Sequence, residues 1–122
     1  MILRTLMIAA VSLTLLANAE AQPKGPNGGV VVKVEGHPIE FVLREQEIVF
    51  YVGDDDGKPL PTKGLKARAI VQDGGKTTTI NLTPAAPNML VGKLAAPMGP
   101  KARVVFSSSV HGHSLQARFV AP

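Results

Sequence analysis

The sequence predicts an all-β protein, an antiparallel immunoglobulin-like β-sandwich of seven to eight strands. Short runs rich in Val, Ile, Thr and Phe alternate apolar with polar residues, which is the pattern of a half-buried strand. Gly, Pro, Asp and Asn separate these runs about every 8–12 residues. No segment after the first 21 residues repeats with the period of about 3.6 residues that marks an amphipathic helix. A small β-barrel is the alternative, because the Cys-Trp-Cys signature of true immunoglobulin domains is absent.

The start of the chain has the pattern of a cleavable secretory signal peptide. Arg4 supplies a positive charge, Leu6–Leu16 is predominantly apolar, and two small-x-small cleavage sites end at Ala19 and Ala21. The apolar run is too short for a membrane span of about 20 residues, so we expect no membrane anchor in the mature chain. The mature protein is therefore expected in the periplasm. The predicted organisation is a signal peptide at residues 1–21 and a single β-sandwich domain at residues 22–122.

Composition excludes several classes of function. The chain has no cysteine, which rules out disulfides, thiol catalysis, a lipid anchor on cysteine and cysteine-based zinc sites. The net charge is +4, but the basic residues are spread along the chain. With one Tyr and no Trp there is little to stack on bases, so we expect no nucleic-acid binding.

The first strand pair surrounds a turn at Glu35-Gly36, a dipeptide suited to a two-residue β-hairpin. With that turn, residues whose numbers add to 71 face each other, for example Val30 and Phe41. A slip of one residue would turn every apolar side chain toward water, so the alternation fixes the register. The predicted inward face consists of Val30, Val32, Val34, His37, Ile39, Phe41 and Leu43.

In the middle of the chain, the alternation of apolar and polar residues predicts four further strands, at Glu47–Val52, Lys66–Gln72, Lys76–Leu82 and Asn88–Leu94. In the first of them Ile48, Phe50 and Val52 share the inward face. The second and third form a hairpin around Asp73-Gly74-Gly75, in which alternate residues meet inside. Residues 83–87 are expected to form a loop, since they are rich in Pro and Ala. The inward face of the fourth strand is not determined by its sequence.

The last hairpin repeats the logic of the first. His111-Gly112 is its turn, and residues whose numbers add to 223 are partners, which pairs Val104 with Phe119. The predicted outward set is Arg103, Val105, Ser107, Ser109, Ser114, Gln116 and Arg118. The segments Val34-x-Gly36-His37-x-Ile39 and Val110-x-Gly112-His113-x-Leu115 have the same local pattern, so we expect two similar hairpins.

The three histidines are the candidate metal ligands. His37 and His113 each occupy the first strand position after a two-residue turn, and His111 lies in a turn. If both hairpin tips lie at one end of the fold, the imidazoles converge on a site suited to Cu or Zn. The alternative is structural: each histidine covers an open end of the core and forms hydrogen bonds with the backbone.

Two other polar clusters favour structural roles. The Asp54-Asp55-Asp56-Gly57 segment lacks the alternating acidic pattern and the distal Glu of a calcium loop, which favours a solvated turn. The serines at residues 107–109 lack the Gly-x-Ser-x-Gly elbow and its strand-turn-helix context. We therefore expect no catalytic residue and no enzyme.

Four short segments resemble small periplasmic β-sandwich proteins, which are similar to the N-terminal segment of periplasmic adaptor subunits of heavy-metal efflux systems. These segments are Gly25-Pro26-Asn27-Gly28-Gly29, Gly36-His37-x-Ile39-Glu40, Asp56-Gly57-Lys58-Pro59 and Gln116-Ala117-Arg118-Phe119. The resemblance implies a periplasmic accessory module in transition-metal homeostasis or efflux, whose partners are periplasmic components of a metal-efflux system. Asn27 stands where that family more often has His, which removes one possible ligand. The alternative function is a metal-free protein-protein docking domain that uses an exposed strand edge or loop face.

Overall fold

The computed structural model describes residues 23–122, so the predicted signal peptide at residues 1–21 lies outside the described residues. Eight strands and no helix make up this part of the chain. A search of residues 23–122 accordingly finds no helix with the length and hydropathy needed to cross a membrane. The strands are β1 (Val30–Val34), β2 (His37–Leu43), β3 (Glu47–Val52), β4 (Ala67–Asp73), β5 (Lys76–Ala85), β6 (Met89–Lys93), β7 (Arg103–Val110) and β8 (His113–Val120).

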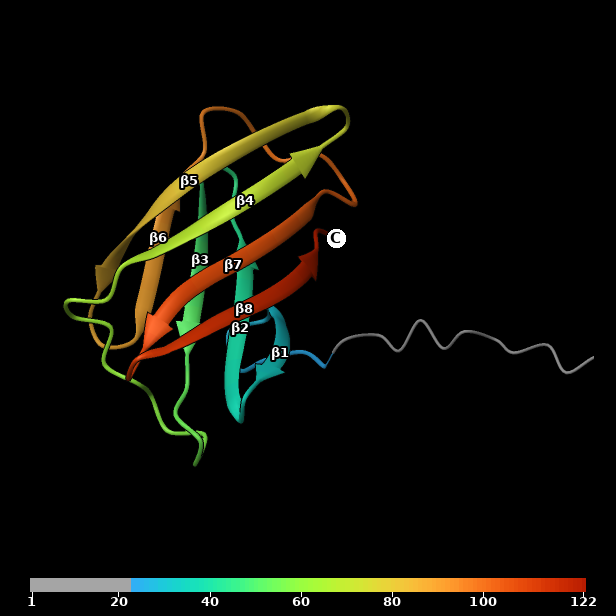
Figure 1. Cartoon of the computed structure of the whole chain (residues 1–122). Helices are drawn as coiled ribbons and strands as arrows, with labels where there is room; N and C mark the ends of the chain where they lie inside the picture. Colours follow the sequence, from blue (N-terminus) through green and yellow to red (C-terminus); the bar gives the residue numbers. More distant parts are fainter. Residues whose placement is uncertain (1–22) are drawn as a thin grey trace, which may run out of the picture.

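All eight strands belong to one antiparallel sheet in the order β1-β2-β3-β6-β5-β4-β7-β8. Figure 1 shows the sheet curled so that β4, β5, β7 and β8 cross in front of β2, β3 and β6. The long strand β5 joins the two halves, since it pairs with β4 through Leu82 and with β6 from Thr83 onward. The all-β, antiparallel prediction is confirmed. The ladders form a single sheet rather than two separate ones, and the immunoglobulin-like sandwich stays a prediction.

The sheet is nearly closed, because its two outer strands β1 and β8 contact each other without forming a ladder. The entry segment occupies part of the edge of β1 that faces away from β2. There the Val31 N–H donates to the Pro23 carbonyl at 2.9 Å, and Lys24 forms an isolated bridge with Val30. These contacts use backbone groups that a β1–β8 ladder would need.

Both predicted hairpin registers are confirmed. Val30 pairs with Phe41 in the first hairpin, and Val104 pairs with Phe119 in the last. In both turns the two central residues have positive φ: 48° and 81° at Glu35-Gly36, and 49° and 77° at His111-Gly112. Such turns twist in the same sense as the strands they connect, which is why they favour two-residue hairpins.

The predicted loop at residues 83–87 is wrong in its first half, because β5 continues through Ala85. Proline has no backbone N–H and usually ends a strand. Pro84 is tolerated in β5 because it lies beyond Leu82, the last β5 residue that pairs with β4, so no ladder with β4 needs its N–H. The inward face of β6, which the sequence left undetermined, is the face of Leu90, which is fully buried.

Glycine at position 92 of β6 makes room for side chains of β5. A Cβ on Gly92 would lie 2.6 Å from the Ile80 Cγ2 atom, so the absence of a side chain lets Ile80 pass close over β6.

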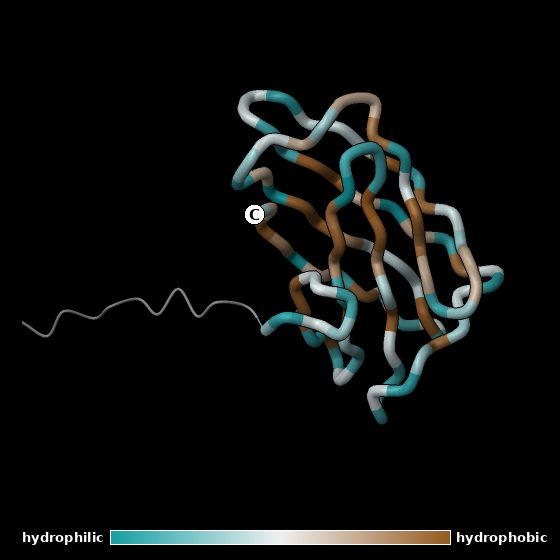
Figure 2. The backbone as a smooth tube through the Cα atoms, turned by 180° about the vertical axis from the view of Figure 1, so that it is seen from behind, coloured by the Kyte–Doolittle hydropathy of each residue, from teal (hydrophilic) through white to brown (hydrophobic). Residues whose placement is uncertain are grey.

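The core is centred on the four phenylalanines of the chain, Phe41, Phe50, Phe106 and Phe119. Phe50 lies at the centre, with ring centroids 5.4 Å from Phe41, 4.8 Å from Phe106 and 5.8 Å from Phe119. The tilted rings are within the range in which aromatic pairs attract each other. Because these residues lie on β2, β3, β7 and β8, the cluster packs the two halves together. Figure 2 shows that the hydrophobic residues lie mainly along the strands, whereas the turns are mainly hydrophilic.

Replacing the central ring should therefore destabilise the whole protein. Phe50→Ala is expected to lower the free energy of unfolding by about 3–5 kcal/mol, because the side chain is fully buried and contacts three other rings. Val120→Ala, at a position that is 52% exposed, is the matched control and should cost less than about 0.5 kcal/mol. Chemical denaturation measures both, and equal losses would contradict this description of the core.

Candidate functional site

The carboxylate of Glu40 organises the glycine-rich entry loop at residues 25–29. Glu40 lies on the outer face of β2, yet only 4% of it is exposed because the loop covers it. Its oxygens accept hydrogen bonds from the Asn27 N–H at 3.0 Å, the Asn27 Nδ2 amide at 2.9 Å and the Gly29 N–H at 2.8 Å. Charge-assisted bonds of this kind are stronger than neutral ones. Two of the segments in the family resemblance, the entry loop and the β2 strand, thus form one unit.

Two loop glycines are required by close contact rather than by positive φ. A Cβ on Gly25 would collide with the Glu40 carboxyl group, and one on Gly29 would collide with the Phe41 carbonyl oxygen. Glu40 is absent from the predicted inward face of the hairpin, and the sequence alone predicted no role for it. The available signal was an acidic residue on a strand that follows a glycine-rich loop, because backbone N–H groups of such loops often bind carboxylates.

Glu40 also belongs to a row of outward residues that crosses four strands. The ladders place Val31, Glu40, Tyr51 and Met89 opposite one another on neighbouring strands. The entry loop and the connection after β3 rise on either side, enclosing a shallow hollow of about 1070 Å³. Each strand beneath this surface is either paired on both sides or covered along its outer edge. The hollow therefore presents side chains to a ligand but few unpaired backbone N–H and C=O groups.

His37 is half-buried at the tip of the first hairpin and is fixed by a backbone contact. Its Nδ1 atom lies 2.9 Å from the Gly53 carbonyl oxygen. A carbonyl only accepts hydrogen bonds, so Nδ1 carries the proton and Nε2 is left as the atom with a free lone pair. Metal-binding histidines are commonly oriented in this way. The arrangement fits the structural alternative as well, since it joins the hairpin to the end of β3.

The other two histidines lie on the second hairpin, where His111 and His113 are both exposed. Within residues 23–122, the one group of three acidic, histidine or cysteine side chains with ligand atoms within 4.8 Å of one another is Asp54, Asp55 and Asp56. The structure thus brings together the acidic turn and leaves the three imidazoles outside any such group. The Asp54 Oδ1 atom accepts the N–H groups of Asp56 and Lys58 at 2.9 and 2.8 Å, which closes the turn.

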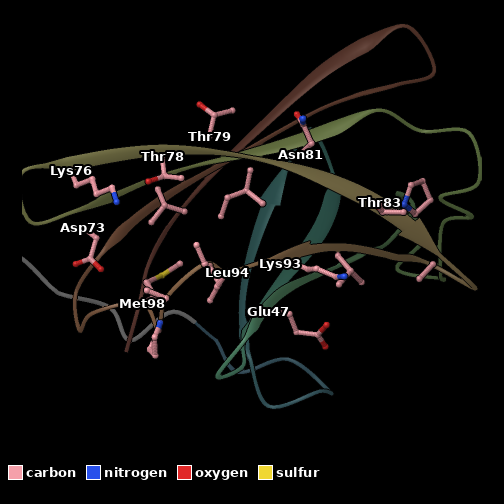
Figure 3. A pocket seen from close by; sticks show the side chains of 18 residues that line it. Glu47, Asp73, Lys76, Thr78, Thr79, Asn81, Thr83, Lys93, Leu94 and Met98 are labelled. Carbon is pink, nitrogen blue, oxygen red and sulfur yellow. The ribbon is translucent and has the colours of Figure 1, made fainter.

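A second hollow opens where β5 and β6 diverge, and sequence analysis did not predict it. We call this space, of about 820 Å³, the β5 hollow. Figure 3 shows Leu94 and Met98, from the loop after β6, across the hollow from β5, while Thr79 and Asn81 point away from it. Its walls are mainly apolar, and its lining includes Val71, Ile80, Val91, Leu94 and Met98.

One edge of β5 is free beside this hollow. Lys76 and Asp73 flank a two-residue turn and form a hydrogen-bonded pair, so alternate residues from Lys76 bond to β4. The residues between them, Thr77, Thr79 and Asn81, direct their N–H and C=O groups to the other side. There the ladder with β6 covers only Thr83–Ala85, so the described part of the chain supplies no ladder partner for these three residues.

Comparison with known proteins adds no relative from which a function could be inferred. No protein-family model, no curated protein and no solved structure matches the chain. The functional argument is therefore carried by the geometry described above, which offers a fixed histidine with a neighbouring acidic turn and a free strand edge over an apolar hollow.

Removing the charge of Glu40 should release the entry loop without unfolding the sheet. Glu40→Gln replaces one acceptor oxygen by an NH₂ group that would face N–H donors, and we expect a loss of about 1–3 kcal/mol in the free energy of unfolding. The amides of Asn27 and Gly29 should exchange with solvent faster than in the wild type. Glu35→Gln, in an exposed turn, is the control. Unchanged exchange at both amides in Glu40→Gln would contradict the assigned role.

Proposed function

We propose that the protein is an exported, non-enzymatic accessory module that binds a protein partner at the β5 hollow. The observation that carries the proposal is the free edge of β5 beside mainly apolar walls. A strand edge with unpaired backbone groups is a ready template for pairing with another chain, and protein folds normally cover it. Here the edge adjoins a space within the usual size range of binding pockets, about 300–1,000 Å³.

The cellular setting of the proposal rests on the sequence. The predicted signal peptide supports export to the periplasm, and the four segments that resemble heavy-metal efflux adaptors support a role beside such a system. The hydrogen bonds of Glu40 to Asn27 and Gly29 give two of these segments a common structural purpose. At the level of the fold, an immunoglobulin-like sandwich is supported by the two halves that pack through the phenylalanine cluster.

Site-specific photo-crosslinking tests docking at the β5 hollow. A photoreactive phenylalanine derivative at Thr79 should form an adduct of defined mass in periplasmic extract of the native host, whereas the same group at Arg103, exposed on β7 and paired on both sides, should not. Met98→Lys places a charge in the wall of the hollow and should abolish the adduct, while Gln116→Lys should preserve it. Adducts of equal yield at both positions, or none at Thr79, would contradict docking at this place.

Metal binding is the second candidate function, and the orientation of His37 favours it. The proton on Nδ1 is held by the Gly53 carbonyl, which leaves Nε2 able to coordinate Cu or Zn. The acidic turn is a neighbour, since a Cβ on Gly36 would lie 3.7 Å from the Asp55 Cβ atom. Carboxylate oxygens are acceptable additional ligands for zinc.

Calorimetric titration of the exported protein with Cu(II) and Zn(II) tests this candidate. We expect a dissociation constant below about 100 μM and a higher melting temperature in the presence of the metal, because a ligand that prefers the folded state stabilises it. His37→Ala should abolish binding. The double variant His111→Ala and His113→Ala should retain it, since neither residue belongs to a group of close ligands with His37. Equal binding by wild type and His37→Ala would rule out the site.

A further inference from the structure

We propose that the partner segment binds as an added β-strand, pairing with Thr77, Thr79 and Asn81 of β5. This inference rests on the proposed docking function and specifies its geometry. Each of the three residues offers one N–H and one C=O group along the free edge, and an extended peptide presents the same groups at the same spacing. A compact ligand could not satisfy a row of three such pairs. The occupant is therefore an extended peptide segment of a partner protein.

The walls of the β5 hollow determine which side chains the segment should carry. Side chains of directly paired residues share a face of the sheet. Peptide residues opposite Thr78 and Ile80 would thus point inward, toward Leu94 and Met98, and should be apolar. Residues opposite Thr77 and Thr79 would point outward, where polar residues are expected because these threonines are exposed. The segment should accordingly alternate apolar and polar residues.

Charge adds a further requirement at the two ends of the paired stretch. Asp73 and Glu47 on the rim already have partners: the Gly99 N–H donates to Asp73 Oδ2 at 2.8 Å, and the Arg44 Nε atom lies 3.9 Å from Glu47. Lys76 and Lys93 also line the hollow, and neither forms an ion pair with another described residue.

The two free lysines fix the spacing of the complementary charges. The β5–β6 ladder ends at the Thr83–Val91 pair, and Lys93 lies two residues beyond Val91 at the Asn81 end of the free edge, whereas Lys76 lies five residues from Asn81 along β5. Five residues of extended chain span about 17 Å. The segment should therefore carry acidic residues about five positions apart, one at each end of the alternating stretch.

Two synthetic peptides that differ in strand direction test the proposal, Glu-Thr-Val-Thr-Val-Glu and Glu-Val-Thr-Val-Thr-Glu. At least one should bind the exported protein with a dissociation constant below about 1 mM in an NMR titration. Binding should slow amide exchange at Thr77, Thr79 and Asn81 by about tenfold or more. N-methylation removes the donors that face β5 and keeps the side chains: these donors belong to the two threonines of Glu-Val-Thr-Val-Thr-Glu, which pairs antiparallel, and to the two valines of Glu-Thr-Val-Thr-Val-Glu, which pairs parallel. The peptide that binds should no longer bind when it is N-methylated in this way.

A matched pair of protein variants completes the test. Thr79→Pro removes one donor from the free edge, where proline is tolerated because that N–H does not serve the ladder with β4. It should abolish peptide binding, and Thr79→Val, which keeps the N–H, should preserve it. The proposal is overturned if neither peptide binds, if the N-methylated peptide binds equally well, or if Thr79→Pro alters only the sedimentation mass, which would mean pairing between two copies. Crosslinking at Thr79 without peptide binding would leave docking intact and reject the added strand.

Discussion

The packing of four phenylalanine rings across the two halves of the sheet is the interaction on which the rest of the structure depends. Among residues 23–122, the strand ladders join the halves only through β5, and the other possible junction, between β1 and β8, has no ladder. Hydrogen bonding alone would therefore leave an open eight-stranded sheet, with nothing to hold β1 against β8. Phe50 on β3 contacts Phe106 on β7 and Phe119 on β8, which brings the two halves together. Closure of this fold is thus mainly a hydrophobic event.

The β5 hollow follows from the same closure. Because β5 serves both halves, it must leave β6 at Thr83 in order to stay paired with β4, and the two strands diverge from that point. Gly92 permits the divergence, since it lets the side chains of Ile80 and Leu82 reach across β6 into the core. The consequence is a stretch of β5, residues 77–81, that is unpaired along one edge and only partly covered on its inner side, where Ile80 is half-buried and Thr78 is exposed. The candidate docking site is therefore the part of the β5 junction where β5 is paired with β4 but no longer with β6.

The sequence was sufficient to predict those features that depend on neighbouring residues. Each hairpin register follows from a two-residue turn and strict alternation, both of which are local. The continuation of β5 was missed because Pro84 has no N–H, and proline is tolerated there only because β4 begins at Ala67, opposite Leu82. The role of Glu40 was missed because its burial comes from a loop more than ten residues earlier in the chain. Likewise, the positions of the histidines relative to one another depend on how the hairpin tips are placed around the sheet, which no local pattern specifies.

The two candidate functions occupy opposite ends of the same strand and so do not compete for space. β3 begins at Glu47, on the rim of the β5 hollow, and ends at Val52, next to the Gly53 carbonyl that orients His37. Its six residues span about 20 Å of extended chain. A metal ion at His37 would therefore not contact a peptide strand added to β5. Coupling between the two sites would have to pass through β3 and Phe50, a fully buried part of the core, and a close-packed interior offers few discrete alternative arrangements. For this reason the two sites should act independently, and each can be tested without disturbing the other.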